Sequence, residues 1–235
     1  MPVYYLNDGR GNQRCFLYIG VPKTGNTTLH RAFTNDGWIP FYDQRQNNLT
    51  VYGALKCPAQ HFHAPMLETL FNLKAFDDVF MVVRHPVRRM VSDYLWMTRN
   101  KDANSRPRFD HWVDWILRQY QANPYIGDNH IRPQAEYVVP EARVFRYEDG
   151  LETVVASVYR RLGVSKRTAV AVPRENTSED QTGLRSRDVI VPDATRAKIE
   201  AVYARDFELF GYEMSGVQDG EAKIPDRAQA SQRGP

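Results

Sequence analysis

The chain alternates short apolar runs with longer amphipathic stretches. Residues 15–21 (CFLYIGV) and 78–83 (DVFMVV) are apolar runs of strand length, and turn-forming Gly or Pro residues lie at or just after the end of each. A helix-like pattern follows, at 27–33 after the first run and at 87–100 after the second. We therefore expect two buried strands, each leading through a tight loop into a helix.

The rest of the chain repeats this order. Residues 142–145 predict a third strand and 151–162 a helix, and a further helix at 193–210 is expected to end at Gly211. Residues 109–120 carry apolar side chains at three-and-four spacing, the pattern of one buried helix face. These positions are Phe109, Trp112, Val113, Ile116, Leu117 and Tyr120. Strands that alternate with helices predict an α/β fold in which helices flank a central parallel sheet.

The length of 235 residues fits one domain, because single hydrophobic cores extend to about 250 residues. We expect this domain to occupy residues 1–214. Residues 215–235 are rich in Gly, Asp, Gln and Arg and are expected to form a flexible tail. Two polar segments, 100–108 and 173–188, are expected to be surface loops, and either one is a candidate for the border of a substrate cleft.

The composition is that of a folded protein, with 42% hydrophobic and 25% charged residues. The net charge of +3 is basic but falls short of the dense positive stripe of a nucleic-acid binder. We therefore expect a small anionic ligand and no nucleic-acid partner. Two cysteines, Cys15 and Cys57, are too few for a disulfide framework and are wrongly spaced for a zinc site, which favours a reducing compartment.

The compartment expected from the sequence is the cytoplasm. Residues 1–12 lack the charged start and apolar run of a secretory signal, and no apolar stretch approaches the roughly 20 residues of a transmembrane helix. The alternative is the lumenal domain of a membrane-anchored enzyme from which the anchor has been trimmed. Such a domain would have the same sequence features.

Residues 20–28 (GVPKTGNTT) have the outline of a phosphate-binding loop. The spacing follows GxxxxGK[ST], but Asn26 stands where the lysine belongs, and the lysine has moved to position 23. A loop between a buried strand and a helix directs main-chain N–H groups at an anion, and Gly25 permits a close approach. The alternative is an ordinary strand-to-helix turn without a ligand.

The second strand argues against magnesium-dependent phosphoryl transfer. A nucleotide triphosphatase would supply an acidic magnesium ligand here, whereas residues 78–83 lead into Arg84. A sulfuryl group carries less charge than a phosphoryl group, so hydrogen bonds and a lysine suffice for its transfer. Lys23 is then expected to stabilise the charge on the leaving phosphate oxygen, and no metal is expected.

A second anion site is expected where the second strand enters its helix. Arg84 offers a planar fork of donors, and Ser92, eight residues later, adds a hydroxyl that grips the same phosphate. Pro86 fixes the entry into the helix. The neighbouring Arg88 and Arg89 are expected to be solvated side chains of a surface helix.

These motifs give the chain a family resemblance. PKTGNTT (22–28) and RHPVRRMVSDY (84–94) resemble the two donor-binding motifs of sulfotransferases that use 3'-phosphoadenosine 5'-phosphosulfate (PAPS), especially the carbohydrate branch, called family 2, that includes heparan and chondroitin enzymes. FRYED (145–149) and HIRPQ (130–134) resemble that family's RYED and HxxPQ elements. The resemblance extends over roughly residues 14–212.

The resemblance implies a P-loop-like, three-layer α/β domain that transfers a sulfuryl group from PAPS to a hydroxyl group of a glycan or glycoconjugate. The first motif would hold the 5'-phosphosulfate and the second, through Arg84 and Ser92, the 3'-phosphate; the product would be adenosine 3',5'-bisphosphate (PAP), and no metal is implied. The expected binding residues of the first motif are Pro22, Lys23, Thr24, Gly25, Asn26, Thr27 and Thr28.

A histidine is expected to take the proton of the acceptor hydroxyl, because its pKa lies near neutrality. His61 and His63 (QHFHA) resemble the HxH pair of heparan 2-O-sulfotransferase-like enzymes. They share one side if the segment is extended and diverge if it is helical. The alternative role of this pair, metal binding, lacks a third ligand at suitable spacing.

Residues of the HxxPQ element are candidates for the acceptor side of the site. His130, Arg132 and Gln134 either line that side or anchor a loop. The aromatic residues Trp38, Tyr42 and Trp96 either stack on sugar rings or pack in the core.

Two other functions remain open on the sequence. A P-loop nucleotide kinase would need magnesium and a lysine at position 26, where Asn26 stands. A non-enzymatic module that binds polyanions through its arginines would have no use for Lys23 inside a glycine loop.

Overall fold

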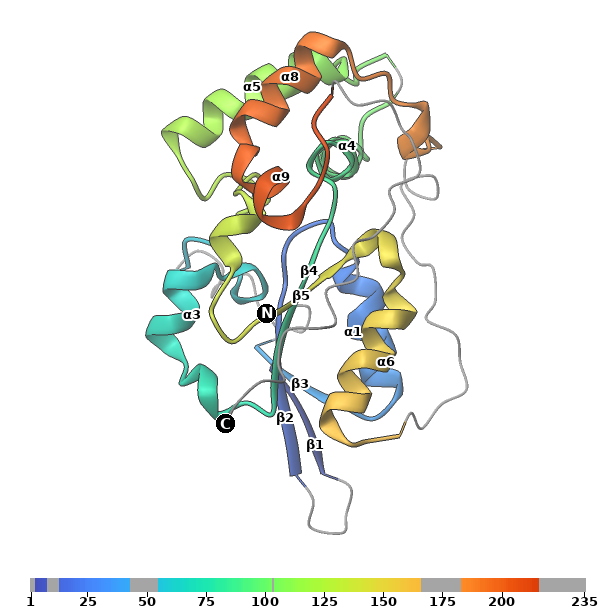
Figure 1. Cartoon of the computed structure of the whole chain (residues 1–235). Helices are drawn as coiled ribbons and strands as arrows, with labels where there is room; N and C mark the ends of the chain where they lie inside the picture. The colour runs from blue at the N-terminus through green and yellow to red at the C-terminus, as the bar shows by residue number, and fades with distance from the viewer. Residues whose placement is uncertain (1–2, 8–12, 43–54, 103, 166–182, 216–235) are drawn as a thin grey trace.

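A computed structural model describes residues 3–7, 13–42, 55–102, 104–165 and 183–215 (Figure 1). The strands are β1 (Val3–Asn7), β2 (Gln13–Ile19), β3 (Ile39–Phe41), β4 (Asp78–Val83) and β5 (Arg143–Arg146). The α-helices are α1 (Asn26–Asn35), α3 (Ala64–Leu70), α4 (Pro86–Met97), α5 (Phe109–Ala122), α6 (Leu151–Leu162), α8 (Asp193–Val202) and α9 (Ala204–Phe210). Short 3-10 helices are η2 (Ala59–His61), η3 (Leu73–Ala75), η4 (Gln134–Tyr137), η5 (Tyr147–Asp149) and η6 (Ser186–Asp188).

The five strands form one mixed sheet in the order β3-β1-β2-β4-β5. Strands β2, β4 and β5 are parallel, which confirms the predicted α/β fold with a parallel centre. Strands β1 and β3, which the sequence analysis did not predict, add an antiparallel edge beside β2. Because β2 and β4 run in the same direction, the loops after Ile19 and Val83 leave the same edge of the sheet.

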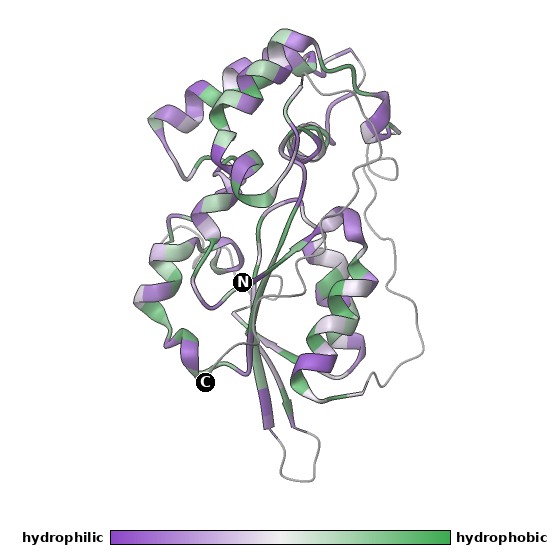
Figure 2. Ribbon diagram, viewed as in Figure 1, coloured by the Kyte–Doolittle hydropathy of each residue, from purple (hydrophilic) through white to green (hydrophobic). Residues whose placement is uncertain are grey.

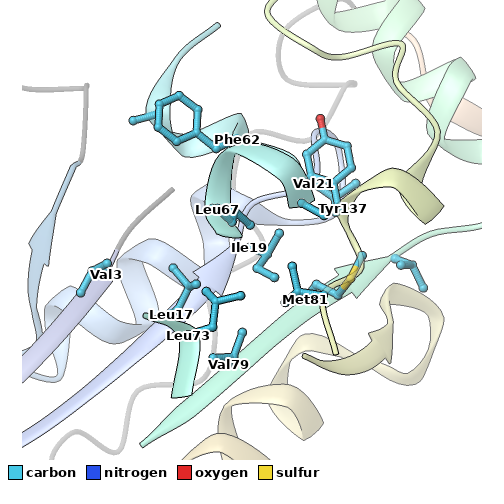
Figure 3. Packing of buried hydrophobic residues seen from close by; sticks show 14 of the residues in the cluster. Val3, Leu17, Ile19, Val21, Phe62, Leu67, Leu73, Val79, Met81 and Tyr137 are labelled. Carbon is cyan, nitrogen blue, oxygen red and sulfur yellow. The ribbon is translucent and has the colours of Figure 1, made fainter. Parts of the chain in front are cut away.

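Alternate residues of the strands face two hydrophobic clusters. On one face, Leu17, Ile19 and Met81 pack against α3, where Leu67 is fully buried (Figure 3). On the other face, α1 and α6 cover a cluster that includes Phe16 and other aromatic side chains (Figure 1). The sheet is thus the middle layer of three, and its two-residue alternation fills both interfaces.

A third cluster joins α4, α5, α8 and α9, which lie together beyond the carboxyl end of β4 (Figure 1). Figure 2 shows mixed hydrophobic and hydrophilic positions along these helices. Phe109, Trp112, Val113 and Ile116 of α5 are buried in this cluster, which confirms the predicted apolar face. This helical group holds α4 over the end of the sheet.

The predicted helix at 193–210 is two helices, because the chain breaks at Tyr203. Tyr203 has φ −105° and ψ 23°, outside the helical range, and its buried hydroxyl donates to the main-chain oxygen of Ile131 at 2.6 Å. The predicted end at Gly211 is confirmed, since this residue adopts the left-handed conformation with φ 63°.

Part of the sequence predictions falls outside the described residues. This applies to 216–235 of the predicted tail and to 173–182 of the second predicted loop. The described residues of that loop, 183–188, include η6. Within the described segments, none of the helices has the length and apolar character needed to cross a bilayer.

Candidate active site

The loop between β2 and α1 contains two residues in the left-handed region. Gly25 has φ 94° and Lys23 has φ 66°. A Cβ on Gly25 would be strained at this φ and would lie 2.6 Å from Cδ1 of Leu151, so glycine is strongly favoured there. Lys23 bears the strain of a side chain in this conformation. Turns of this kind direct main-chain N–H groups toward a common point, and the N-terminus of α1 adds its partial positive charge.

Hydrogen bonds from side chains of β2 and of the loop itself hold the loop in place. Tyr18 Oη donates to Asn26 Oδ1 at 2.5 Å, and Thr24 Oγ1 donates to the main-chain oxygen of Val21 at 2.8 Å. Burial raises the pKa of Tyr18, so its hydroxyl remains a donor. The side-chain oxygen of Asn26 is therefore held by the end of β2, and the positive charge of the loop comes from Lys23.

The Lys23 ammonium lies over the indole ring of Trp96, with Nζ 5.2 Å from the ring centroid. No ion pair joins it to an acidic group among the described residues. Burial lowers the pKa of Lys23 to about 8; Asp93 raises it, and Arg84 and Arg99 lower it further. A half-buried cation that faces two other cations is suited to bind an anion.

Arg84 joins the end of β4 to this loop. Its Nη1 donates to the main-chain oxygen of Lys23 at 3.3 Å, and its guanidinium carbon lies 4.5 Å from the ring centroid of Tyr147. The Gln134 amide clamps the main chain of Arg84, accepting from its N–H and donating to its oxygen, both at 2.8 Å. Asp206 in turn fixes Gln134, accepting from its main-chain and side-chain N–H groups. The two predicted anion-binding motifs therefore lie side by side.

One side of α4 extends this basic surface. Arg88, Ser92 and Trp96 lie on this side at four-residue spacing, Arg99 follows just beyond the end of the helix, and the four side chains are exposed or half-buried. The guanidinium carbon of Arg99 lies 4.3 Å from the centroid of Trp96. Nε of Arg84, at the start of this side, is buried and has no partner among the described residues. Arginine and hydroxyl donors therefore continue from the Lys23 loop along this side of the helix.

The prediction that Arg88 and Arg89 are both solvated is wrong for Arg89. Arg88 is exposed, but Arg89 is only 1% exposed, since it points into the helical cluster beside Tyr203. Its guanidinium donates to the main-chain oxygens of His130 and Arg132 at 2.8 and 3.0 Å. Arg89 therefore fixes the HxxPQ segment rather than contacting solvent.

His61 of the HxH pair contacts the loop directly. Its Nδ1 lies 2.7 Å from the main-chain oxygen of Gly20. A carbonyl only accepts, so Nδ1 carries the proton and Nε2 faces the Gln60 amide at 3.3 Å. Burial holds the pKa of His61 well below its usual value, and His130 and Lys23 lower it further. His61 is therefore a neutral imidazole.

His63 lies apart from this cluster. It precedes α3, and its ring centroid is 5.9 Å from that of Tyr125 and 6.5 Å from that of Tyr137. Burial lowers the pKa of His63, as does Arg132. Its Nδ1 is buried and makes no hydrogen bond with the described residues. The two histidines thus have different surroundings, and His61 is the one that contacts the loop.

His130 lies beside Trp96 and His61. Its Nδ1 is 2.6 Å from Oδ1 of Asp93, which is 1% exposed. The imidazole stacks on Trp96, with a centroid separation of 4.8 Å, and its centroid is 5.1 Å from that of His61 in an edge-on contact. Asp93 was not among the predicted site residues. It stands next to Ser92, but nothing in the sequence pairs it with a histidine 37 positions away.

The other two candidates of the HxxPQ element have structural contacts. Arg132 donates to Asn129 Oδ1 at 2.7 Å and forms an ion pair with Glu136. Gln134 is 0% exposed, and its amide is occupied by the main chain of Arg84. Arg132 and Gln134 therefore anchor loops, which is the alternative that the sequence analysis left open. Of the three residues, only His130 contacts the indole of Trp96, over which the Lys23 ammonium lies.

The RYED segment supports the start of α4. Glu148 accepts from the main-chain N–H of His85 and from the hydroxyl of Tyr212, both at 2.9 Å. A carboxylate at this helix N-terminus also satisfies the helix dipole. Among the described residues, His, Cys, Asp and Glu side chains do not gather in groups of three or more suited to a metal ion.

Comparisons with known proteins assign the chain to a family. A search of curated proteins finds no match. Among solved structures, a sulfotransferase from Alicyclobacillus acidocaldarius is similar, with 15% sequence identity and a TM-score of 0.48; the match covers 85% of this chain and 96% of that one. The model of the Sulfotransferase family, Sulfotransfer_2, matches residues 12–213. The chain therefore belongs to the sulfotransferase family.

Proposed function

We propose that this sulfotransferase uses PAPS as its donor and transfers the sulfuryl group to a hydroxyl of a carbohydrate. The observation that carries the proposal is the contact between Arg84 and the main chain of Lys23. It brings two cationic segments to one edge of the sheet, beyond the carboxyl ends of β2 and β4. Anionic ligands of α/β proteins bind at such edges.

The loop after β2 suits the 5'-phosphosulfate. Its main-chain N–H groups and the Lys23 ammonium would bind the phosphate oxygens, together with the hydroxyls of Thr27 and Thr28. Lys23 has no anionic partner of its own in the described chain, so the donor would supply the missing charge. Pro22, Thr24, Gly25 and Asn26 shape the loop.

The start of α4 suits the 3'-phosphate. Arg84 retains a buried Nε without a described partner, and Ser92 lies on the half-buried side of the helix. A guanidinium and a hydroxyl are suitable donors for a dianionic phosphate. This assignment distinguishes PAPS from donors that lack a 3'-phosphate.

The reaction is an in-line displacement at sulfur. The acceptor oxygen forms a bond to sulfur while the bond from sulfur to the 5'-phosphate oxygen breaks, and PAP leaves. Lys23 stabilises the negative charge that develops on that leaving oxygen. A histidine beside the loop takes the acceptor proton. No step of this reaction requires a metal ion from the protein.

Ligand binding and turnover together test this function. PAP without magnesium should raise the melting temperature of the protein, whereas a kinase would respond to ATP with magnesium. PAPS and a panel of glycans, lipids and small alcohols should yield sulfated products. Lys23→Ala should lower the rate by about 100-fold, whereas Lys74→Ala, at an exposed lysine of η3, should not.

The alternatives predict different results. Stabilisation only by ATP with magnesium would indicate a kinase. Binding of polyanions without any response to PAP would indicate a non-enzymatic module. Full turnover by the Lys23→Ala variant would contradict the proposed role of the loop.

A further inference from the structure

We propose that His130 is the general base of the transfer and that Asp93 is the residue that positions it. This inference rests on the proposed function and identifies the group that receives the acceptor proton. The HxH pair was the expectation from the sequence. The contacts of the described residues favour His130 over both members of that pair.

The backbone before His130 is strained and tightly held. Asp128 and Asn129 both have positive φ, 59° and 71°, and Asn129 is fully buried. The Asn129 amide donates to the main-chain oxygen of His61 at 2.9 Å, and Arg89 donates to that of His130 at 2.8 Å. Strained residues persist where surrounding contacts determine them, and they concentrate at functional sites. These bonds fix the position from which the imidazole extends.

The bond to Asp93 determines which nitrogen of His130 is free. A carboxylate accepts, so Nδ1 carries the hydrogen in this 2.6 Å contact and Nε2 retains its lone pair. Nε2 makes no hydrogen bond with any described residue. The second oxygen of Asp93, Oδ2, is buried and also lacks a described partner. When Nε2 receives a proton, the positive ring forms an ion pair with a carboxylate already in contact with it.

His61 is less suited to hold a proton. Its Nε2 already faces the Gln60 amide, and burial holds its pKa well below the usual value. No carboxylate contacts its ring among the described residues; its Nδ1 partner is the carbonyl of Gly20. Protonation would add a buried positive charge next to Lys23. The contacts of His61 instead suit a residue that holds the loop in place.

Trp96 connects the proposed base to the proposed anion site. The His130 ring stacks on the indole at 4.8 Å, and the Lys23 ammonium lies 5.2 Å from the centroid of the same indole. The group that takes the proton and the group that stabilises the leaving oxygen therefore contact one rigid aromatic side chain. Such an arrangement allows both to act on one bound donor.

The chemistry balances with these residues alone. The acceptor oxygen bonds to sulfur, the bond from sulfur to the 5'-phosphate oxygen breaks, and the hydroxyl proton moves to Nε2 of His130. The products are the sulfate ester and PAP, and His130 later releases its proton to solvent. With water as acceptor, the same steps yield inorganic sulfate and PAP.

Matched asparagine variants test the assignment. Asparagine places an amide N–H where histidine has Nδ1, so His130→Asn keeps the bond to Asp93 and His61→Asn keeps the bond to Gly20. Each variant keeps a donor at the Nδ1 position and removes Nε2 together with the rest of the ring, including the ring contacts of that histidine. Release of PAP from PAPS, with water and with the hydroxyl panel, should fall about 100-fold or more for His130→Asn. For His61→Asn we expect a fall of less than about ten-fold.

Measurements of PAP binding distinguish a failure of this inference from a failure of the proposed function. The Kd of His130→Asn for PAP should stay within about three-fold of the wild type, since a base contributes to the transition state and not to donor binding. Wild-type rates in His130→Asn, or a loss confined to His61→Asn, would overturn the inference and leave the proposed function standing. A wild-type chain that neither binds PAP nor releases it from PAPS would overturn both.

A second variant, at Asp93, tests the inference even if the His130 variant does not fold. Asp93→Asn should lower kcat about ten-fold or more while the KM for PAPS stays within about two-fold, because His130 loses both its orientation and the carboxylate that stabilises its protonated ring. The assay belongs at pH 6.5, since Asp93 also raises the pKa of Lys23 and that lysine must stay charged. Asp93→Glu should recover part of the rate. If kcat fell, the KM rose and the melting temperature dropped together, the role of Asp93 would be purely structural and the inference would be refuted.

Discussion

The guanidinium of Arg84 donates a hydrogen bond to the main-chain oxygen of Lys23, across a distance of 3.3 Å. Arg84 follows strand β4, whereas Lys23 lies in the loop after the neighbouring parallel strand β2. Because Gln134 clamps both main-chain polar groups of Arg84, the guanidinium extends from a fixed point. This contact brings together two cationic segments that are 61 positions apart in the sequence.

Replacing Arg84 should remove recognition of the 3'-phosphate selectively. We expect Arg84→Ala to weaken PAP binding by about 10- to 100-fold, because a hydrogen bond to a charged group contributes about 1.5–3 kcal/mol. Binding of adenosine 5'-phosphate, which lacks that phosphate, should change by less than about three-fold. Calorimetry with both nucleotides measures the difference, with Arg118→Ala at an exposed position of α5 as the control. Equal losses for the two nucleotides would refute the assignment.

Donor affinity should fall as the pH rises through the pKa of Lys23, which burial lowers to about 8. Only the ammonium attracts the anion, so PAP affinity should drop about ten-fold between pH 7 and pH 9. The unfolded chain binds more protons than the folded one between this pKa and the ordinary lysine pKa of 10.5, so this lysine makes the fold more stable as the pH rises. Lost affinity in that range would therefore not reflect unfolding.

The variant Lys23→Arg provides the control for this pH dependence. A guanidinium stays charged throughout the range, so PAP affinity should become independent of pH between 7 and 9. An unchanged pH dependence in Lys23→Arg would show that another group titrates.

Gly20 should tolerate no side chain. A Cβ there would lie 2.4 Å from the main-chain oxygen of Gln60, so the loop and the segment before His61 would have to separate. We expect Gly20→Ala to lower stability by about 1–3 kcal/mol and to weaken PAP binding at least ten-fold. Gly163→Ala is the matched control. That residue has φ 65° but open space around it, so its cost should be about 1 kcal/mol, with unchanged PAP binding.

The sequence predicts those elements whose signals are local. Strand β4 and helix α6 have the predicted bounds, because a continuous apolar run and an amphipathic stretch identify them. Strands β1 and β3 were missed for different reasons. The alternation of β1 spans only Val3–Asn7, and β3 has three residues, of which Ile39 and Phe41 are exposed. Pairing with neighbouring strands, rather than their own pattern, makes these segments extended.

The candidate site likewise has one part that local sequence signals predict and another that depends on packing. The loop around Lys23 and the strand end at Arg84 were predicted because glycine spacing and an arginine after an apolar run are local signals. Residue type suggested HxH as the base, and that role stays a prediction. The contact of His130 with Asp93 depends on how α4 packs against the HxxPQ segment, which no spacing rule encodes. The burial of Arg89 beneath that segment follows from the same packing.

Substitutions at the start of β4 should change the stability of the fold without changing donor binding. Asp78, at the start of this strand, is buried and accepts two hydrogen bonds from Arg143 of β5, at 2.9 and 2.5 Å. Arg143→Met leaves that carboxylate buried without its cation, so we expect a loss of about 3 kcal/mol in the free energy of unfolding. Asp78→Asn combined with Arg143→Met should lose less, because no unpaired charge remains. Since Arg84 follows the opposite end of β4, the Kd for PAP at a temperature where all variants are folded should stay within about two-fold of the wild type. A larger change in Kd would show that the pair at the start of the strand influences the loops at its end.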